Sequence, residues 1–145
     1  PKIARCFAFV GPHLPLDAHF AAGNFLRDAL AGHAIRIQGD GRPYRSYLHS
    51  ADLVAWLLAI LVRGEPLRPY NVGSDQAVSI EDLARRVARL ASPAVEVSIH
   101  GKPGSAPPPR YVPSTVRARR ELGLEAWLHL DAALQRTFAW LKSTR

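Results

Sequence analysis

Strand-like and helix-like stretches alternate along the 145 residues of this chain, and this alternation restricts the fold more than any other feature. Segments rich in β-branched and aromatic residues predict strands at residues 3–10, 35–38, 46–49, 69–72 and 95–99. Apolar residues at helical spacing predict helices at residues 17–31, 50–62, 80–90, 114–122 and 130–141. Strands that alternate with helices are typical of the α/β class. No internal repeat and no second composition is visible, so we expect residues 1–145 to form a single unit.

Local signals refine three of these segments. Ser50 is expected to cap the second helix, and Ser79 with Asp82 three positions later forms a capping-box-like start for the third. The body of the second helix is apolar on every side, so we expect it to be buried. Residues 101–113 are rich in glycine and proline, which precludes a helix and favours an extended loop that acts as a lid or a tether.

Cysteine content and hydropathy exclude several classes of protein. The single cysteine, Cys6, rules out an intrachain disulfide framework and argues against a structural zinc cluster, so we expect a reducing, cytoplasmic environment and no metal site. The longest apolar run, residues 53–62, is too short to cross a bilayer, and no leader-like segment precedes the globular pattern. We therefore expect a soluble protein without a membrane partner.

The formal charge of +7 and the pI near 10.3 raise the possibility of nucleic-acid binding. The sixteen arginines and three lysines are dispersed, however, and no lysine-rich tail is present. Arg85, Arg86 and Arg89 fall on the polar side of an amphipathic helix, which is the pattern of a solvated surface. The charge fits several local anion contacts better than a nucleic-acid partner.

The segment at residues 38–52, QGDGRPYRSYLHSAD, carries the clearest chemical signal. A Gly-Asp-Gly turn is followed by Arg45, four residues after Gly41, and then by an aromatic strand that runs into an acidic helix start. An arginine held between a tight turn and a strand end can direct two N–H groups onto a phosphate. The segment therefore indicates a phosphorylated small molecule as the ligand.

Four segments together resemble a known family, the extended short-chain dehydrogenases/reductases that epimerise or dehydrate nucleotide-sugars. RCFAFVGP at residues 5–12 is similar to the family's sixth strand, and residues 39–49 are similar to its Gly-Asp-Gly and Arg-Asp-Trp-Leu-Tyr element. YNVG at residues 70–73 is similar to its Tyr-Asn-Ile-Gly, and residues 110–123 are similar to its Arg-x-x-x-Asp run that ends in Glu-Leu-Gly. The segments occur in the family's order. The resemblance covers essentially the whole chain and is to the carboxy-terminal half of those enzymes, so it implies the last part of a Rossmann sheet followed by a substrate-binding subdomain.

The resemblance implies roles for particular residues. Arg45 and Arg110 match arginines that bind the substrate diphosphate, and Asn71 matches an asparagine near the nucleotide. Without the family, an exposed ion pair for either arginine and a turn-stabilising amide for Asn71 are the simpler interpretations. His49 stands where the family often has tyrosine, and we expect it to serve packing rather than catalysis.

Further positions follow from the same resemblance. Arg36 and Gln38 occupy the strand that lines the nucleotide base, although the usual aromatic residue is missing. Asn24 lies on the preceding helix, where a phosphate contact and a buried, satisfied amide are both compatible with its position. The residues that would edge the nicotinamide pocket are Cys6, Phe7 and Ala8. The chain departs from the family pattern at Ala8, Val10, Ser46 and Ser114, so we expect the substrate to differ in detail.

Two features that the family needs for redox chemistry do not occur in the sequence. A glycine-rich turn at a helix start, which binds the dinucleotide pyrophosphate, is absent. The catalytic tyrosine of the family has a lysine four residues later, and no tyrosine here has one; these tyrosines are Tyr44, Tyr47, Tyr70 and Tyr111. We therefore assign no catalytic residue to this chain.

The resulting expectation is the substrate-binding portion of an NAD(P)-dependent nucleotide-sugar epimerase or 4,6-dehydratase, catalytically incompetent by itself. NAD or NADP would serve the intact enzyme without being bound by this chain alone, and we expect a homo-oligomer. Alone, the chain would expose apolar surface and an unpaired strand edge. Two alternatives remain open: a stand-alone nucleotide or nucleotide-sugar binding module, and a basic nucleic-acid-binding protein.

Overall fold

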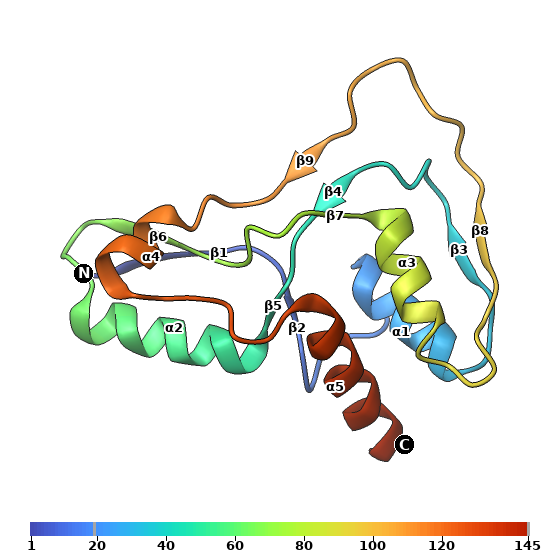
Figure 1. Ribbon diagram of the computed structural model, residues 1–145, viewed down its shortest axis with the longest axis horizontal. Helices are drawn as coiled ribbons and strands as arrows, with labels where there is room; N and C mark the ends of the chain where they lie inside the picture. Colours follow the sequence, from blue (N-terminus) through green and yellow to red (C-terminus); the bar gives the residue numbers. More distant parts are fainter. Residues whose placement is uncertain (19, 145) are drawn as a thin grey trace.

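The computed structural model describes residues 1–18 and 20–144 and has an elongated shape in which strands and helices alternate (Figure 1). The strands are β1 (Ile3–Cys6), β2 (Phe9–Val10), β3 (Ile35–Ile37), β4 (Tyr44–Arg45), β5 (Leu48–His49), β6 (Pro69–Val72), β7 (Val78–Ser79), β8 (Val97–Ile99) and β9 (Arg110–Tyr111). The helices are α1 (Ala21–Leu30), α2 (Ser50–Arg63), α3 (Ile80–Ala88), α4 (Val116–Leu122) and α5 (Leu130–Ser143).

Parallel pairing of short strands dominates the sheets. β1 pairs with β6, β2 with β5 and β3 with β8, all in parallel. β4 lies at the centre of a three-stranded sheet, antiparallel to β7 and parallel to β9. Parallel strands need long crossover connections, and the helices between these strands supply them. The α/β prediction is confirmed.

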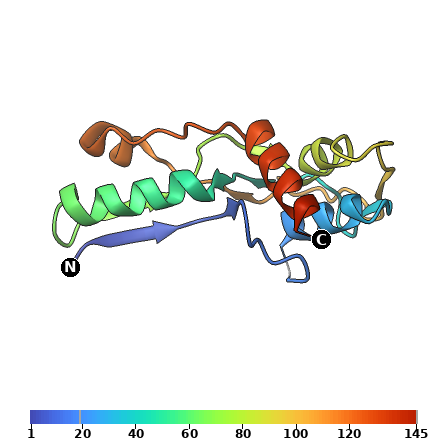
Figure 2. The ribbon, with the colours of Figure 1, turned by 90° about the horizontal axis from the view of Figure 1, so that it is seen from below.

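The apolar interior consists of two clusters. The first joins α1, α3 and α5 to β3 and includes Phe25, Leu83 and Leu134. The second joins α2, α4 and β6 and includes Trp56 and Tyr70. Figure 2 shows the two groups of helices at opposite ends of the molecule. The strands between them, β2, β4 and β5, connect the two ends.

Several predicted elements have different limits in the structure. The strand predicted at residues 3–10 is interrupted at residues 7–8. Of the strand predicted at residues 46–49, only β5 at Leu48–His49 is present, and β4 ends before that range. The helix predicted at residues 17–31 begins at Ala21. Ser50 is the first residue of α2 rather than its cap, because the Nδ1 atom of His49 accepts the backbone N–H of Ala51. Ser79 does cap α3, where its Oγ atom accepts the N–H of Asp82.

The prediction that the apolar body of α2 is buried was wrong for half of the helix. Ile60 is only 2% exposed, but Leu58, Leu61 and Val62 are 57%, 64% and 76% exposed. The helix packs one face on β5, β6 and α4, and no described residue covers the opposite face. All four residues of β1 are likewise exposed, and its only strand partner in the described chain is β6. The predicted exposed apolar surface and unpaired strand edge are therefore both present.

None of the helices in the described residues combines the length and the apolar character that a membrane span requires.

Candidate functional site

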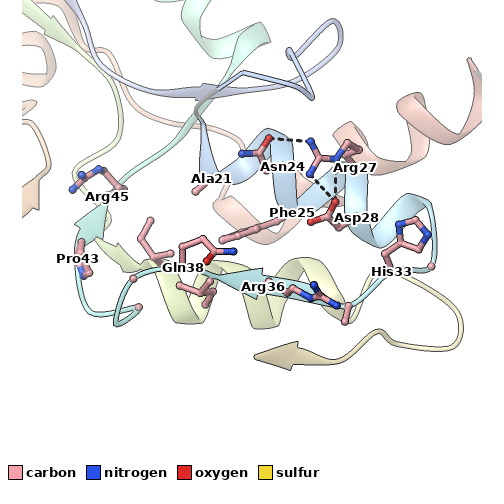
Figure 3. A pocket seen from close by; sticks show the side chains of 16 residues that line it. Ala21, Asn24, Phe25, Arg27, Asp28, His33, Arg36, Gln38, Pro43 and Arg45 are labelled. Carbon is pink, nitrogen blue, oxygen red and sulfur yellow. Dashed lines mark hydrogen bonds and ion pairs between the residues drawn. The ribbon is translucent and has the colours of Figure 1, made fainter. Parts of the chain in front are cut away.

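A cavity of about 1030 Å³ lies between α1, β3 and the start of β4 (Figure 3). Four residues that the sequence analysis singled out line it: Asn24, Arg36, Gln38 and Arg45. They come from α1, β3, the residue after β3, and β4. The cavity is therefore bordered by residues brought together from three separate elements.

β3 contributes both a charged and an apolar residue to the cavity, Arg36 and Ile37. Ile35 and Ile37 are buried in the first apolar cluster, so the pleat of the strand directs Arg36 to the opposite face. Gln38 follows directly at the end of the strand. On the opposite wall, Asn24 lies one turn before Arg27 on α1, and Arg27 donates a hydrogen bond to its Oδ1 atom at 3.4 Å.

The Gly-Asp-Gly turn connects β3 to β4. Gly41 has a φ of +73°, a conformation that glycine adopts without strain. The Asp40 carboxylate accepts the backbone N–H of Arg42 at 3.1 Å and its Nε–H at 2.7 Å. The side-chain hydrogen bond from Arg42 is the main cause that lowers the pKa of Asp40, so this carboxylate remains ionised. The closed turn places Arg45 at one end of the cavity (Figure 3).

The charges around the cavity favour an anion. Arg27 is paired with Asp28, with 2.8 Å between Nη2 and Oδ1. Arg36 and Arg45 form no ion pair with any described residue. The Arg45 guanidinium donates a hydrogen bond to the carbonyl oxygen of Tyr44 at 2.9 Å. Two guanidinium groups therefore retain free N–H donors. Arginine donors of this kind recognise phosphate oxygens well.

Arg110 lies on β9, the strand next to β4 that carries Arg45, but it does not line the cavity. β9 is parallel to β4, with Tyr44 opposite Arg110 and Arg45 opposite Tyr111. Because neighbouring residues of a strand point to opposite faces, Arg45 and Arg110 project from opposite faces of this sheet. Their strands are adjacent, but the two guanidinium groups do not converge on a common anion pocket.

Asn71 and the segment before β2 lie outside the cavity as well. Asn71 accepts the Nε–H of Arg5 at 2.9 Å and donates to the carbonyl oxygen of Ser114 at 2.9 Å, so its amide joins β1, β6 and the segment before α4. Phe7 packs its ring on Tyr111, with 5.0 Å between the centroids. The other two residues of this segment, Cys6 and Ala8, are exposed and half-buried.

His49 has a structural environment that agrees with a packing role. Its side chain is buried, its Nδ1 atom caps α2, and its Nε2 atom has no hydrogen-bond partner among the described residues. Burial is the main cause that lowers the pKa of His49. The imidazole is therefore neutral near neutral pH, and it lies outside the lining of the cavity.

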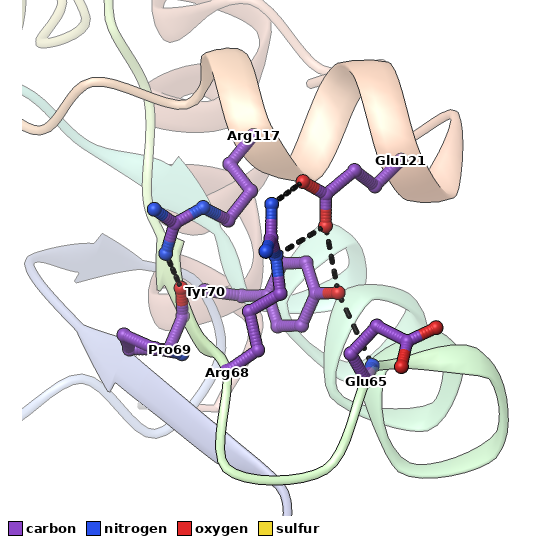
Figure 4. A network of polar contacts seen from close by, with 6 residues as sticks. All are labelled: Glu65, Arg68, Pro69, Tyr70, Arg117 and Glu121. Carbon is purple, nitrogen blue, oxygen red and sulfur yellow. Dashed lines mark hydrogen bonds and ion pairs between the residues drawn. The ribbon is translucent and has the colours of Figure 1, made fainter.

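A polar network at the other end of the molecule fixes α4 on β6 (Figure 4). The Nε atom of Arg68 donates to Glu121 at 2.9 Å, and Tyr70 donates its hydroxyl to the same carboxylate at 3.0 Å. The hydrogen bond from Arg68 is the main cause that lowers the pKa of Glu121. Arg117 adds a hydrogen bond to the carbonyl oxygen of Pro69 at 2.6 Å. This network is structural, since none of its residues lines the cavity.

Several residues near the site were not predicted from the sequence. Arg27 and His33 line the cavity, and Tyr111 contacts both Phe7 and Arg45. A signal for Arg27 was available, because it lies three residues after Asn24 and therefore on the same helix face. Nothing in the sequence indicated the contacts of Tyr111, which depend on how residues 101–113 return to β4.

Comparison with known proteins gives matches along the whole chain. The model of a family described as "NAD dependent epimerase/dehydratase family" matches residues 1–73. The chain is 30% identical over 134 residues to UDP-glucuronic acid decarboxylase 5 of Arabidopsis thaliana, which covers 92% of this chain but 38% of that protein. The chain thus spans well under half the length of this relative.

Solved structures give the same result for the fold. An epimerase from Methanothermobacter thermautotrophicus superimposes with a TM-score of 0.86 at 26% identity, covering 99% of this chain and 43% of that one. The enzyme WbmF of Bordetella bronchiseptica, solved in complex with NAD+ and UDP, gives a TM-score of 0.83 at 26% identity, covering 97% of this chain and 45% of that one.

Proposed function

The chain belongs to the NAD dependent epimerase/dehydratase family, and from this premise we propose that it binds the nucleotide-sugar substrate of an NAD(P)-dependent epimerase or dehydratase. In this proposal the cavity between α1 and β3 holds the nucleotide, and Arg45 binds the diphosphate. The observation that carries the proposal is the pair of arginines at the cavity, Arg36 and Arg45, whose charges no described carboxylate neutralises. A nucleoside diphosphate supplies the complementary negative charge.

The two ends of the cavity suit different parts of such a ligand. Gln38 and Asn24 offer amide donors and acceptors, which can hydrogen-bond to a nucleobase or ribose without stacking on it. Arg45 marks the end nearest to Tyr111 and Phe7. We therefore place the base toward α1 and β3 and the sugar toward Phe7. Arg110 joins the diphosphate in this proposal only if its side chain leaves the face on which it now lies.

We propose no dinucleotide site within this chain alone. Cys6, Phe7 and Ala8 supply at most one edge of a nicotinamide pocket, and the sequence contains no glycine-rich turn that could approach a pyrophosphate. We therefore derive no hydride-transfer step for this chain. In the proposal its residues bind and orient the nucleotide-sugar, and binding energy from the remote nucleotide orients the reacting sugar.

We also propose that the protein forms a homo-oligomer and is located in the cytoplasm. The exposed apolar face of α2 supports association, and the lone, exposed Cys6 suits a reducing compartment. Light scattering of the purified protein measures the first of these directly.

Calorimetric titration with UDP-glucose, dTDP-glucose and CDP-glucose tests the binding function. We expect at least one of them to bind, and Arg45→Gln to weaken it by about ten- to a hundredfold, since a hydrogen bond to a charged group contributes about 1.5–3 kcal/mol. Arg120→Gln is the matched control, because Arg120 is exposed on α4 and lies outside the cavity lining. The proposal fails if no nucleotide-sugar binds, or if the two variants bind equally well.

A further inference from the structure

β4 and β9 are adjacent in the three-stranded sheet, and each contacts the arginine of the other through a tyrosine. β4 contributes Tyr44 and Arg45, and β9 contributes Arg110 and Tyr111, in a register that places each arginine opposite a tyrosine. The Cζ atom of Arg45 lies 5.9 Å from the ring centroid of Tyr111, and that of Arg110 lies 5.5 Å from the ring centroid of Tyr44. Both distances are within the range of cation–π contacts.

The contact on the cavity side differs from the other one. Tyr111 also packs on Phe7, with 5.0 Å between ring centroids and 35° between ring planes. The ring of Tyr111 is therefore fixed by Phe7 while it also faces the guanidinium of Arg45. Tyr111 is nevertheless 52% exposed, so these contacts leave part of it open to a ligand or to solvent.

An aromatic face and a carboxylate restrain an arginine with different consequences for anion binding. A carboxylate neutralises the guanidinium and occupies its N–H donors, and an anionic ligand must then compete with it. An aromatic ring attracts the cation through its quadrupole and leaves the in-plane N–H groups free. Arg45 has the second kind of restraint, because its contact is with Tyr111 and no described carboxylate pairs with it.

We propose that Tyr111 is a positioning residue for the diphosphate site, which holds the guanidinium of Arg45 in place without neutralising it. The inference rests on the proposed nucleotide-sugar function. It also gives the proline-rich segment (residues 101–113) a role, since that segment delivers Tyr111 to Arg45. The backbone hydrogen bond from Tyr44 N–H to the carbonyl oxygen of Pro109, 2.8 Å long, fixes the segment at this point.

Titrations of the purified protein with UDP and with uridine test the inference, because only UDP carries the phosphates that Arg45 would bind. We expect Tyr111→Leu to weaken UDP about two- to fivefold, the effect of an exposed cation–π contact, and to leave uridine unchanged. Tyr111→Phe keeps the aromatic face and is expected to bind UDP as the wild type does. Trp127→Leu is the control for loss of an exposed aromatic residue elsewhere.

A second set of variants separates positioning from other roles. In an Arg45→Gln background, Tyr111→Leu is expected to have no further effect on UDP, because the two residues act through one contact. The inference is overturned if Tyr111→Leu leaves UDP binding unchanged, or weakens uridine as much as UDP. It is also overturned if UDP-glucose is weakened while UDP is not, which would make Tyr111 a direct sugar contact. A wild-type protein that bound no nucleotide would instead overturn the proposed function itself.

Discussion

Two adjacent residues of α2 predict which face of this helix packs against the rest of the protein. Ile60 is 2% exposed and belongs to the second apolar cluster, whereas Leu61 is 64% exposed. Truncation of a buried isoleucine to alanine costs about 2–5 kcal/mol, from lost burial and the cavity left behind. Truncation of an exposed leucine typically changes stability by less than about 0.5 kcal/mol. We therefore expect Ile60→Ala to cost about 3 kcal/mol and Leu61→Ala almost nothing.

Urea unfolding followed by far-UV circular dichroism measures both variants. With a slope of about 2 kcal/mol per molar urea, the midpoint of Ile60→Ala falls by about 1.5 M, while that of Leu61→Ala stays within about 0.3 M of the wild type. Equal losses for the two variants would refute the reasoning. They would mean that the outer face of α2 is covered in solution, for instance by another copy of the protein, and the exposure of Leu61 in the single chain would then be misleading.

Three further predictions concern pH and close packing. Burial lowers the pKa of His49, so the native state binds fewer protons than the unfolded state between the two pKa values. The contribution of His49 to stability is therefore full above about pH 6.5 and is lost as the pH falls through the pKa of the folded state. His49→Asn can still cap α2 and should flatten this decline in urea midpoints measured from about pH 7 to about pH 5. Burial also raises the pKa of Tyr47 to about 12, so an absorbance titration should show one tyrosine that ionises at higher pH than the others. Stability should fall as the pH rises from about 10 toward about 12. A Tyr47→Phe variant that still showed this high-pH ionisation would contradict the assignment. A Cβ atom at Gly101 would lie 2.4 Å from the backbone carbon of Gly39, so Gly101→Ala should cost about 1–3 kcal/mol in thermal or urea unfolding, whereas Gly104→Ala, whose nearest neighbour is 3.9 Å away, should cost little.

The local chemistry of the sequence predicted most elements but not the surfaces they present. The strand predicted at residues 35–38 and the cap at Ser79 rest on local signals, and the structure confirms both, with the strand at Ile35–Ile37. The apolar pattern of α2 indicated burial on all sides, but periodicity cannot tell whether a second layer is present to cover the outer face. The interruption at residues 7–8 also had no local signal, because it depends on where β1 and β2 find different partners.

The candidate site shows the same division. Asn24, Arg36, Gln38 and Arg45 were named from the sequence, and the structure places all four around one cavity. The resemblance also implied that Arg110 binds the diphosphate together with Arg45, and the structure places their strands side by side. The face from which Arg110 projects depends on the register of β9 against β4, because a shift of one residue would turn its side chain to the other face.

The separation of the apolar interior into two clusters affects how the molecule would melt. The two clusters belong to different groups of helices and are joined largely by short strands, so we expect them to lose their structure in separate steps. The cavity residues of α1 and β3 lie at the first cluster. Phe7 follows β1, donates its backbone N–H to Val72 of β6, and so lies near the second cluster. A ligand that extends from Asn24 to Phe7 would contact both clusters and stabilise them together. Two calorimetric transitions of the free protein would then merge into one in the complex.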